Sequence, residues 1–347
     1  MRAMTVVPGR PESAAVVEIP EPPQQDGAVL VEGLLVGICG TDREISEEGY
    51  GEPPAGEERL VLGHESLGRV LEAPAVSGLA AGDLVMGVVR RPDPVPCPCC
   101  ARGEWDFCRN GRYTERGIKG RHGYGARRWR VDPDFAVRVD PALGDLGVLV
   151  EPASVVAKGW EQIDRITARA CAVIRRVLVT GAGPIGLLAA ELARQRGLDL
   201  VVLDRSESGP KPELARALGA TYVTDLTDVT EEPDVVVECT GYGPLVVDLA
   251  RRLSPGGVLC LTGLSASEEE TPAPLHALNR DLVLANAVIV GTVNAARRHY
   301  EQAAAALANA DRAWLQQLLS RRVPLDRWPE SLHREPDDVK VVVDLRG

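Results

Sequence analysis

Three residues in the first part of the chain are of types that bind zinc. Cys39 stands in the stretch Gly-Ile-Cys-Gly-Thr-Asp, and His64 and Glu65 stand in Gly-His-Glu. A thiolate, an imidazole and a carboxylate, which Glu65 or Glu151 could supply, are ligands that zinc binds tetrahedrally. With three protein ligands, the fourth position takes water or substrate, and the metal lowers the pKa of a hydroxyl there. Each residue alone is weak evidence for a metal site, but together they predict a catalytic zinc site.

A glycine-rich loop suggests a dinucleotide site. Gly181, Gly183 and Gly186 form G-x-G-x-x-G between a strand pattern at Val177–Thr180 and a helix pattern at Leu187–Arg196. This is the context that the motif requires. Gly181 permits the tight turn, Gly183 lets the backbone approach the pyrophosphate at the helix N-terminus, and Gly186 allows close packing of helix on strand.

The next strand pattern ends at Asp204, about 20 residues further on, where a carboxylate is expected to bind the adenosine ribose. Its negative charge would repel a 2′-phosphate, which favours NAD. Arg205 and Ser206 follow, and either could bind that phosphate, so NADP stays an alternative.

Four cysteines crowd into one short segment: Cys97, Cys99, Cys100 and Cys108. In a chain without a secretory signal, such a cluster indicates metal binding more than disulfides. The alternative is a metal-free loop with free thiols.

Two kinds of element must position these residues. The first 150 residues carry short apolar runs broken by Gly and Pro, typical of a β-rich unit. From residue 177 onward, strand and helix patterns alternate, which predicts a doubly wound parallel sheet.

Composition limits the function. The 347 residues suggest about two domains, and the net charge of -11 argues against a nucleic-acid surface, which needs a basic face. No apolar run approaches the roughly 18 residues that span a membrane, and the N-terminus lacks a signal-peptide core. A cytoplasmic protein is therefore expected.

At these residues the sequence resembles the zinc-dependent medium-chain dehydrogenase/reductase superfamily, over nearly the whole chain and most closely in its glucose dehydrogenase branch. The stretches that carry the resemblance are Gly37–Glu44, Leu62–Glu65, Tyr113–Gly117, Leu149–Val156 and Gly291–Tyr300. The resemblance implies an α/β fold with a GroES-like β-rich catalytic domain, residues 1–155 and 295–347, and a Rossmann domain, residues 156–294.

The resemblance also implies roles for individual residues. Catalytic-zinc ligation falls to Cys39, His64, Glu65 and Glu151, and the alcohol proton passes to Thr41. Substrate contacts fall to Thr41, Glu115, Glu151, Asn294 and His299. Nucleotide contacts fall to Gly181, Gly183, Pro184, Ile185, Gly186, Asp204, Arg205, Ser206, Gly263, Leu264, Ser265, Thr292, Val293 and Asn294.

The superfamily's structural zinc loop often reads C-x2-C-x2-C-x7-C. Cys97, Cys100 and Cys108 match its last three positions, but the first is Pro94, which cannot ligate. Cys99 or Asp93 are the candidates to replace it.

The prediction is a zinc-dependent oxidoreductase that moves hydride from a sugar or polyol hydroxyl to NAD(P). The C1 hydroxyl of an aldose such as glucose, giving a lactone, is the first candidate. Alternatives are a cyclitol, threonine-type amino-alcohol or simple alcohol dehydrogenase, or a non-catalytic nucleotide-binding redox sensor. We expect neither nucleic acid nor membrane as partner, and the superfamily implies a homodimer or homotetramer.

Overall fold

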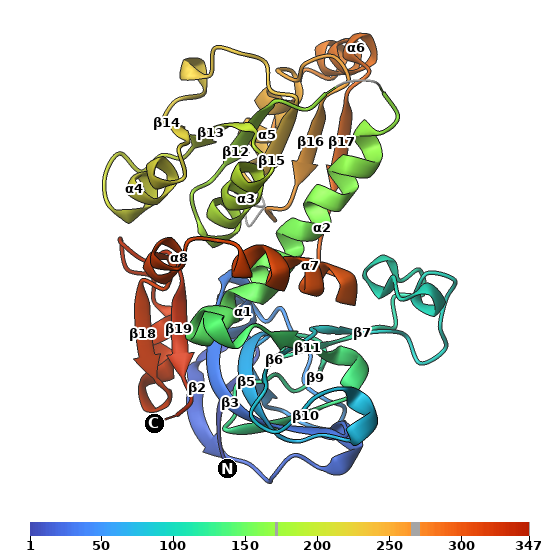
Figure 1. Cartoon of the computed structure of the whole chain (residues 1–347), viewed down its shortest axis with the longest axis vertical. Helices are drawn as coiled ribbons and strands as arrows, with labels where there is room; N and C mark the ends of the chain where they lie inside the picture. The colour runs from blue at the N-terminus through green and yellow to red at the C-terminus, as the bar shows by residue number, and fades with distance from the viewer. Residues whose placement is uncertain (171–172, 265–270, 347) are drawn as a thin grey trace. The chain divides into compact units, whose positions relative to one another are not determined.

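The computed structural model describes residues 1–170, 173–264 and 271–346. The chain divides into two compact units (Figure 1): unit 1 comprises residues 1–154 and 294–347, and unit 2 comprises residues 155–293. Helix α2, Val150–Thr167, begins in unit 1 and continues into unit 2.

A seven-stranded sheet forms the centre of unit 1. Its strands run in the order β11-β6-β5-β3-β19-β18, and β10 also pairs with β3. Strand β3, Val29–Ile38, is buried at most positions. Strand β19, Val341–Asp344, pairs antiparallel with β3. The C-terminal segment therefore completes a sheet that starts near the N-terminus.

Two small three-stranded sheets, β2-β1-β4 and β7-β8-β9, accompany it. The other strands of unit 1 are β1 (Arg2–Val7), β2 (Arg10–Glu18), β4 (Leu60–Val61), β5 (Glu65–Glu72), β6 (Leu84–Gly87), β7 (Arg90–Arg91), β8 (Thr114–Arg116), β9 (Gly120–Arg121), β10 (Arg128–Val131), β11 (Ala136–Val139) and β18 (Arg321–Pro324). Its further α-helices are α1 (Gly40–Glu48), α7 (Arg297–Ala308) and α8 (Arg312–Leu318).

Unit 2 is built on six parallel strands in the order β14-β13-β12-β15-β16-β17. These are β12 (Arg176–Thr180), β13 (Asp199–Leu203), β14 (Thr221–Val223), β15 (Val235–Glu238), β16 (Val258–Leu261) and β17 (Val288–Gly291). The helices between them are α3 (Pro184–Gln195), α4 (Pro210–Ala217), α5 (Gly243–Ala250) and α6 (Leu275–Ala285).

This sheet confirms the predicted doubly wound architecture. Strands β12 and β15 are buried along almost their whole length, as the apolar runs of a parallel sheet covered on both faces require. From β12 the chain continues to β13 and β14 on one side of β12, and it then crosses to β15 on the other side of β12. The carboxyl ends of β12 and β15 are therefore the switch point where such sheets bind ligands.

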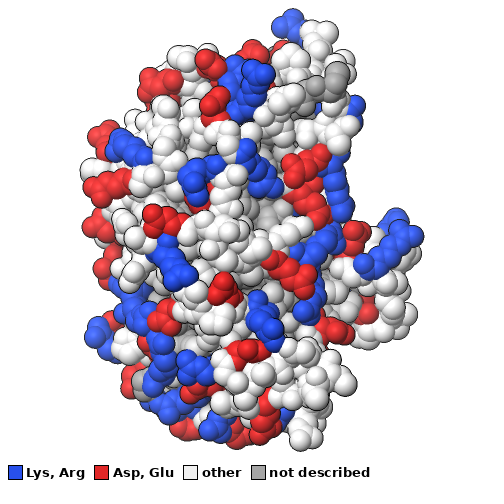
Figure 2. Space-filling view, in the orientation of Figure 1, with Lys and Arg blue, Asp and Glu red and all other residues white. Residues whose placement is uncertain are grey.

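The surface is mixed in charge. On the face shown in Figure 2, acidic and basic side chains are interspersed. Among the described residues, none of the helices is both long and apolar enough to cross a bilayer.

Candidate active site

The ligand atoms of Cys39, His64 and Glu65 lie within 4.8 Å of one another in unit 1. Cys39 follows the last residue of β3 and precedes α1, while Glu65 opens β5, the neighbour of β3. The Cys39 Sγ is 3.0 Å from His64 Nε2. Position 37, which is next to these residues, must be glycine, because a Cβ there would lie 2.0 Å from Glu65 Oε2.

Asp42, for which no role was predicted, orients this group. Its carboxylate accepts the Cys39 backbone N–H at 3.0 Å, which caps α1, and its Oδ1 lies 3.4 Å from His64 Nδ1. A carboxylate on the second nitrogen fixes the ring of a ligating histidine. Burial opposes a charged imidazole, yet the Cys39 and Asp42 charges hold the pKa of His64 well above its usual value. A metal cation would take the place of that proton.

Two further charged groups lie beside the three donors. Lys340 directly precedes β19, and its Nζ lies 2.5 Å from the Glu65 carboxylate and donates to Ile38 O at 3.1 Å. Burial, followed by repulsion from Glu65, raises the pKa of Glu151 to about 7. Glu151 is outside the three-donor group. The residues therefore fit a cation: the half-buried Cys39 sulfur converges with a buried imidazole and a buried carboxylate. The charge of the nearby Glu151 carboxylate interacts with this group.

The glycine-rich loop of unit 2 has the geometry that dinucleotide binding needs. Gly181 has φ of 89°, which favours glycine. A Cβ on Gly186 would lie 1.7 Å from the Gly181 carbonyl oxygen, whereas a Cβ on Gly183 would meet nothing within 4 Å. Gly183 caps α3, and Pro184 and Ile185 form its first turn. The space beside Gly183 therefore lies at the N-terminus of α3, where a phosphate is favoured.

Asp204 is joined to this loop. Its Oδ2 accepts the Ala182 N–H at 2.8 Å and its Oδ1 accepts the Ser206 N–H at 2.9 Å. Burial raises its pKa, but these two hydrogen bonds and the charge of Lys211 outweigh burial, so the pKa is lowered and the carboxylate is charged. The neighbouring Arg205 is exposed.

The other predicted nucleotide contacts follow the next strands of the sheet. Gly263 and Leu264 come after β16, and Thr292 and Val293 come after β17. Carboxyl ends of parallel strands share one edge, so these residues lie on the edge that carries the glycine-rich loop. Ser265 lies outside the described residues.

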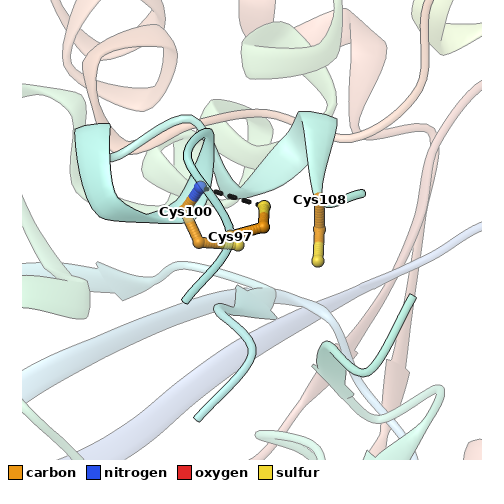
Figure 3. A group of neighbouring side chains, drawn as sticks. All are labelled: Cys97, Cys100 and Cys108. Atoms are coloured by element: carbon orange, nitrogen blue, oxygen red, sulfur yellow. Dashed lines mark hydrogen bonds between the residues drawn. The ribbon is translucent and has the colours of Figure 1, made fainter. Parts of the chain in front are cut away.

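Cys97, Cys100 and Cys108 form a second group of donors within 4.8 Å (Figure 3). The Cys97 Sγ accepts N–H bonds from Arg109 at 3.4 Å and Cys100 at 3.5 Å, and these bonds lower the pKa of Cys97 to about 6. Burial raises the pKa of Cys100 to about 11. A stabilised thiolate beside two more sulfurs fits a zinc ion with three cysteine ligands.

The structure does not bring Cys99 to this group. Cys99 immediately precedes the short helix that Cys100 opens, and successive residues of such a turn point in different directions. Asp93, the other candidate for the fourth ligand, is engaged elsewhere. Its Oδ1 accepts the Val95 N–H at 2.8 Å, and its Oδ2 accepts from Asn110 at 2.9 Å and Arg112 at 3.1 Å.

Comparison with known proteins places the chain in a family. The model described as the C-terminus of glucose dehydrogenase matches residues 144–345, and the alcohol dehydrogenase GroES-like domain matches residues 25–141. Glucose 1-dehydrogenase of Thermoproteus tenax is 40% identical and that of Methanocella arvoryzae 38%, over at least 99% of both chains in each case. The chain belongs to the glucose dehydrogenase branch of the zinc-dependent medium-chain dehydrogenases.

A solved structure supports the same assignment. The glucose dehydrogenase of Haloferax mediterranei, in complex with NADP, zinc and gluconolactone, superimposes with a TM-score of 0.92 at 31% identity and covers 100% of both chains. The chain is thus a zinc-dependent oxidoreductase that uses NAD(P), with a GroES-like domain and a Rossmann domain.

The remaining predicted substrate residues of this glucose dehydrogenase-family chain lie in unit 1. Glu115 is buried, and its Oε1 accepts from Arg90 Nε at 3.0 Å and Asn294 Nδ2 at 2.6 Å. His299 is fully buried at the start of α7, where its Nδ1 accepts the Ala296 N–H at 3.0 Å. Thr41 is half-buried in the first turn of α1.

Sequence reasoning missed Asp42, Lys340 and Arg90. Asp42 ends the stretch that contains Cys39, so its capping spacing was a usable signal. Lys340 and Arg90 carry no local signal, because their partners Glu65 and Glu115 are distant in the sequence.

Proposed function

We propose that this protein oxidises the anomeric C1 hydroxyl of an aldose to a lactone and passes the hydride to NAD. The metal-donor group in unit 1 and the glycine-rich loop in unit 2 support a dehydrogenase. The relatives named glucose 1-dehydrogenase, and the relative solved with gluconolactone, support the substrate.

The observation that carries the sugar assignment is the fixed carboxylate of Glu115. Arg90 and Asn294 hold its Oε1, whereas Oε2 accepts no hydrogen bond from the described residues. Such an oxygen is available to a sugar hydroxyl in a known orientation. A site built this way rejects an analogue that lacks the hydroxyl, because its own polar group is left unpaired. His299 stays a proposed substrate residue through the resemblance, and its Nδ1 accepts the Ala296 N–H.

The chemistry separates one C–H and one O–H bond of the substrate. Zinc, when bound by Cys39, His64 and a carboxylate, supplies a Lewis acid that makes the hydroxyl more acidic. We propose that Thr41 accepts the hydroxyl proton and passes it toward solvent. The C1 hydrogen leaves with its electron pair for the nicotinamide, so the aldose is oxidised to a lactone and NAD is reduced.

The preference for NAD rests on Asp204. Its charged carboxylate would repel the 2′-phosphate of NADP, although the Haloferax relative was solved with NADP. The test compares kcat/KM for both nucleotides in the parent and in Asp204→Ala. The parent should prefer NAD, and the variant should gain mainly with NADP. A parent that prefers NADP would show that Arg205 and Ser206 dominate.

The substrate test measures NADH formation with glucose, galactose and xylose, their 2-deoxy forms, inositol, threonine and ethanol. Activity should be confined to aldoses, and Glu115→Ala should raise KM and erase the penalty for removing the 2-hydroxyl. Activity on inositol, threonine or ethanol alone would assign another dehydrogenase. Nucleotide binding without turnover on any of them would favour a redox sensor.

Assembly and compartment are also proposals. A homodimer or homotetramer in the cytoplasm agrees with the superfamily. Size-exclusion chromatography with light scattering and the location of a tagged chain test these two statements.

A further inference from the structure

Glu238 is a buried carboxylate that lies at the switch point of the unit 2 sheet. It is the last residue of β15, its exposed fraction is 0%, and it pairs in register with Thr180, the last residue of β12. None of the roles assigned above involves it. A carboxylate taken out of water is costly unless hydrogen bonds satisfy it.

Its side chain accepts hydrogen bonds from the turn that follows β15. The Thr240 N–H donates at 2.6 Å and the Gly241 N–H at 3.1 Å, and the Thr240 hydroxyl donates as well. The Thr180 hydroxyl adds a longer bond at 3.4 Å. Since the two backbone N–H groups can only donate, they require an acceptor at this place.

The Glu238 carbonyl oxygen fixes the next strand end. It accepts the Thr262 N–H at 2.8 Å, the Thr262 hydroxyl at 2.8 Å and the Gly263 N–H at 3.1 Å. One residue therefore joins the ends of β12, β15 and β16.

The turn held in this way packs against two glycines predicted to contact the nucleotide. A Cβ on Gly181 would lie 3.0 Å from Thr240 Cγ2, and a Cβ on Gly263 would lie 2.3 Å from Gly241 N. If the Thr240–Gly241 turn were displaced, it would therefore press on the backbone at Gly181 and at Gly263.

We propose that Glu238 is a positioning residue for the dinucleotide, and that it shapes the half of the site on the β15–β16 side of the switch point. Dinucleotides bind across such a point. Asp204 marks the adenosine half on the β13 side, so Glu238 acts on the other half, which takes the nicotinamide. This inference rests on the proposed function, because it assumes that NAD(H) is the ligand.

The test is Glu238→Gln, which keeps the shape of the side chain but replaces an accepting oxygen with an NH2 group near the Gly241 N–H. The Kd values of NADH and of AMP are measured by fluorescence and calorimetry. We expect the Kd of NADH to rise at least tenfold and the Kd of AMP to stay within twofold. Glu191→Gln is the matched control: Glu191 is a buried carboxylate in α3, paired with Arg194 and Gln195, and this variant should leave both Kd values unchanged.

Unchanged NADH binding in Glu238→Gln, or an equal loss of NADH and AMP binding, would overturn the proposal. Thr240→Val serves if Glu238→Gln does not fold. It removes the hydroxyl that bonds Glu238 and accepts the Tyr242 N–H at 3.0 Å, and it should raise the Kd of NADH selectively. A parent protein that binds no NADH would instead refute the proposed function itself.

Discussion

Replacing Lys340 by Met should destabilise the metal-free protein and strengthen its binding of zinc. Lys340 is 1% exposed and Glu65 2%, and their charged atoms are 2.5 Å apart. Removing one partner of a buried ion pair costs about 3–5 kcal/mol, because the other charge is left uncompensated. Met has a similar volume, so little of the loss comes from a cavity.

The effect on zinc has the opposite sign. Lys340 competes with a metal cation for the same Glu65 carboxylate. In the variant, a bound cation can neutralise the unpaired Glu65 charge and so restore part of the stability that the variant lost. If about 2 kcal/mol is returned, the Kd of zinc falls about thirtyfold. Urea unfolding in chelator and in buffered zinc measures both quantities, since ligand stabilisation follows the ratio of free zinc to Kd.

The double variant Lys340→Met with Glu65→Gln is the control. Without the orphaned carboxylate, most of the metal-free stability should return. The reasoning would be refuted by Lys340→Met binding zinc more weakly than the parent, which would mean that Lys340 orients Glu65 for the metal instead of competing with it.

Three further predictions concern the two metal groups and the loop. The metal-free protein should lose stability as pH rises from about 4.5 to about 7, because folding raises the pKa of Glu151 and the folded state holds its proton; pH-dependent unfolding of Glu151→Gln should lack this slope. Gly183→Ala should fold, because its Cβ meets nothing within 4 Å, but it should bind NADH at least tenfold more weakly in a fluorescence titration. Gly186→Ala would place its Cβ 1.7 Å from a carbonyl oxygen, so circular dichroism should show that this variant does not fold normally. Metal analysis should find about two zincs per chain, with one lost in Cys100→Ser; a single zinc that survives this change would assign the cysteine loop as metal-free.

Elements with a local pattern were predictable from the sequence. Strand β12 is an apolar run bounded by turns, and α3 shows helical spacing, so the predicted ranges Val177–Thr180 and Leu187–Arg196 lie close to the observed ones. Helix α2 was not predicted from the sequence; Pro152 lies in its first turn, where proline is tolerated. Strand β14, Thr221–Val223, is too short to show alternation.

The charges around the donor group follow from sheet pairing and not from local sequence. Val341 on β19 pairs with Ile38 on β3, and Gly37 pairs with Glu65 on β5. These two registers bring Lys340 next to the Glu65 carboxylate, although the two residues are far apart in the sequence. The ligand types are visible in the sequence because each lies in a short motif, whereas the ion that balances them depends on which strands are neighbours. A chain that ended after unit 2 would keep Cys39, His64 and Glu65 but lose β19 and with it the counter-charge, so the C-terminal segment contributes to the electrostatics of the metal group as well as to the sheet.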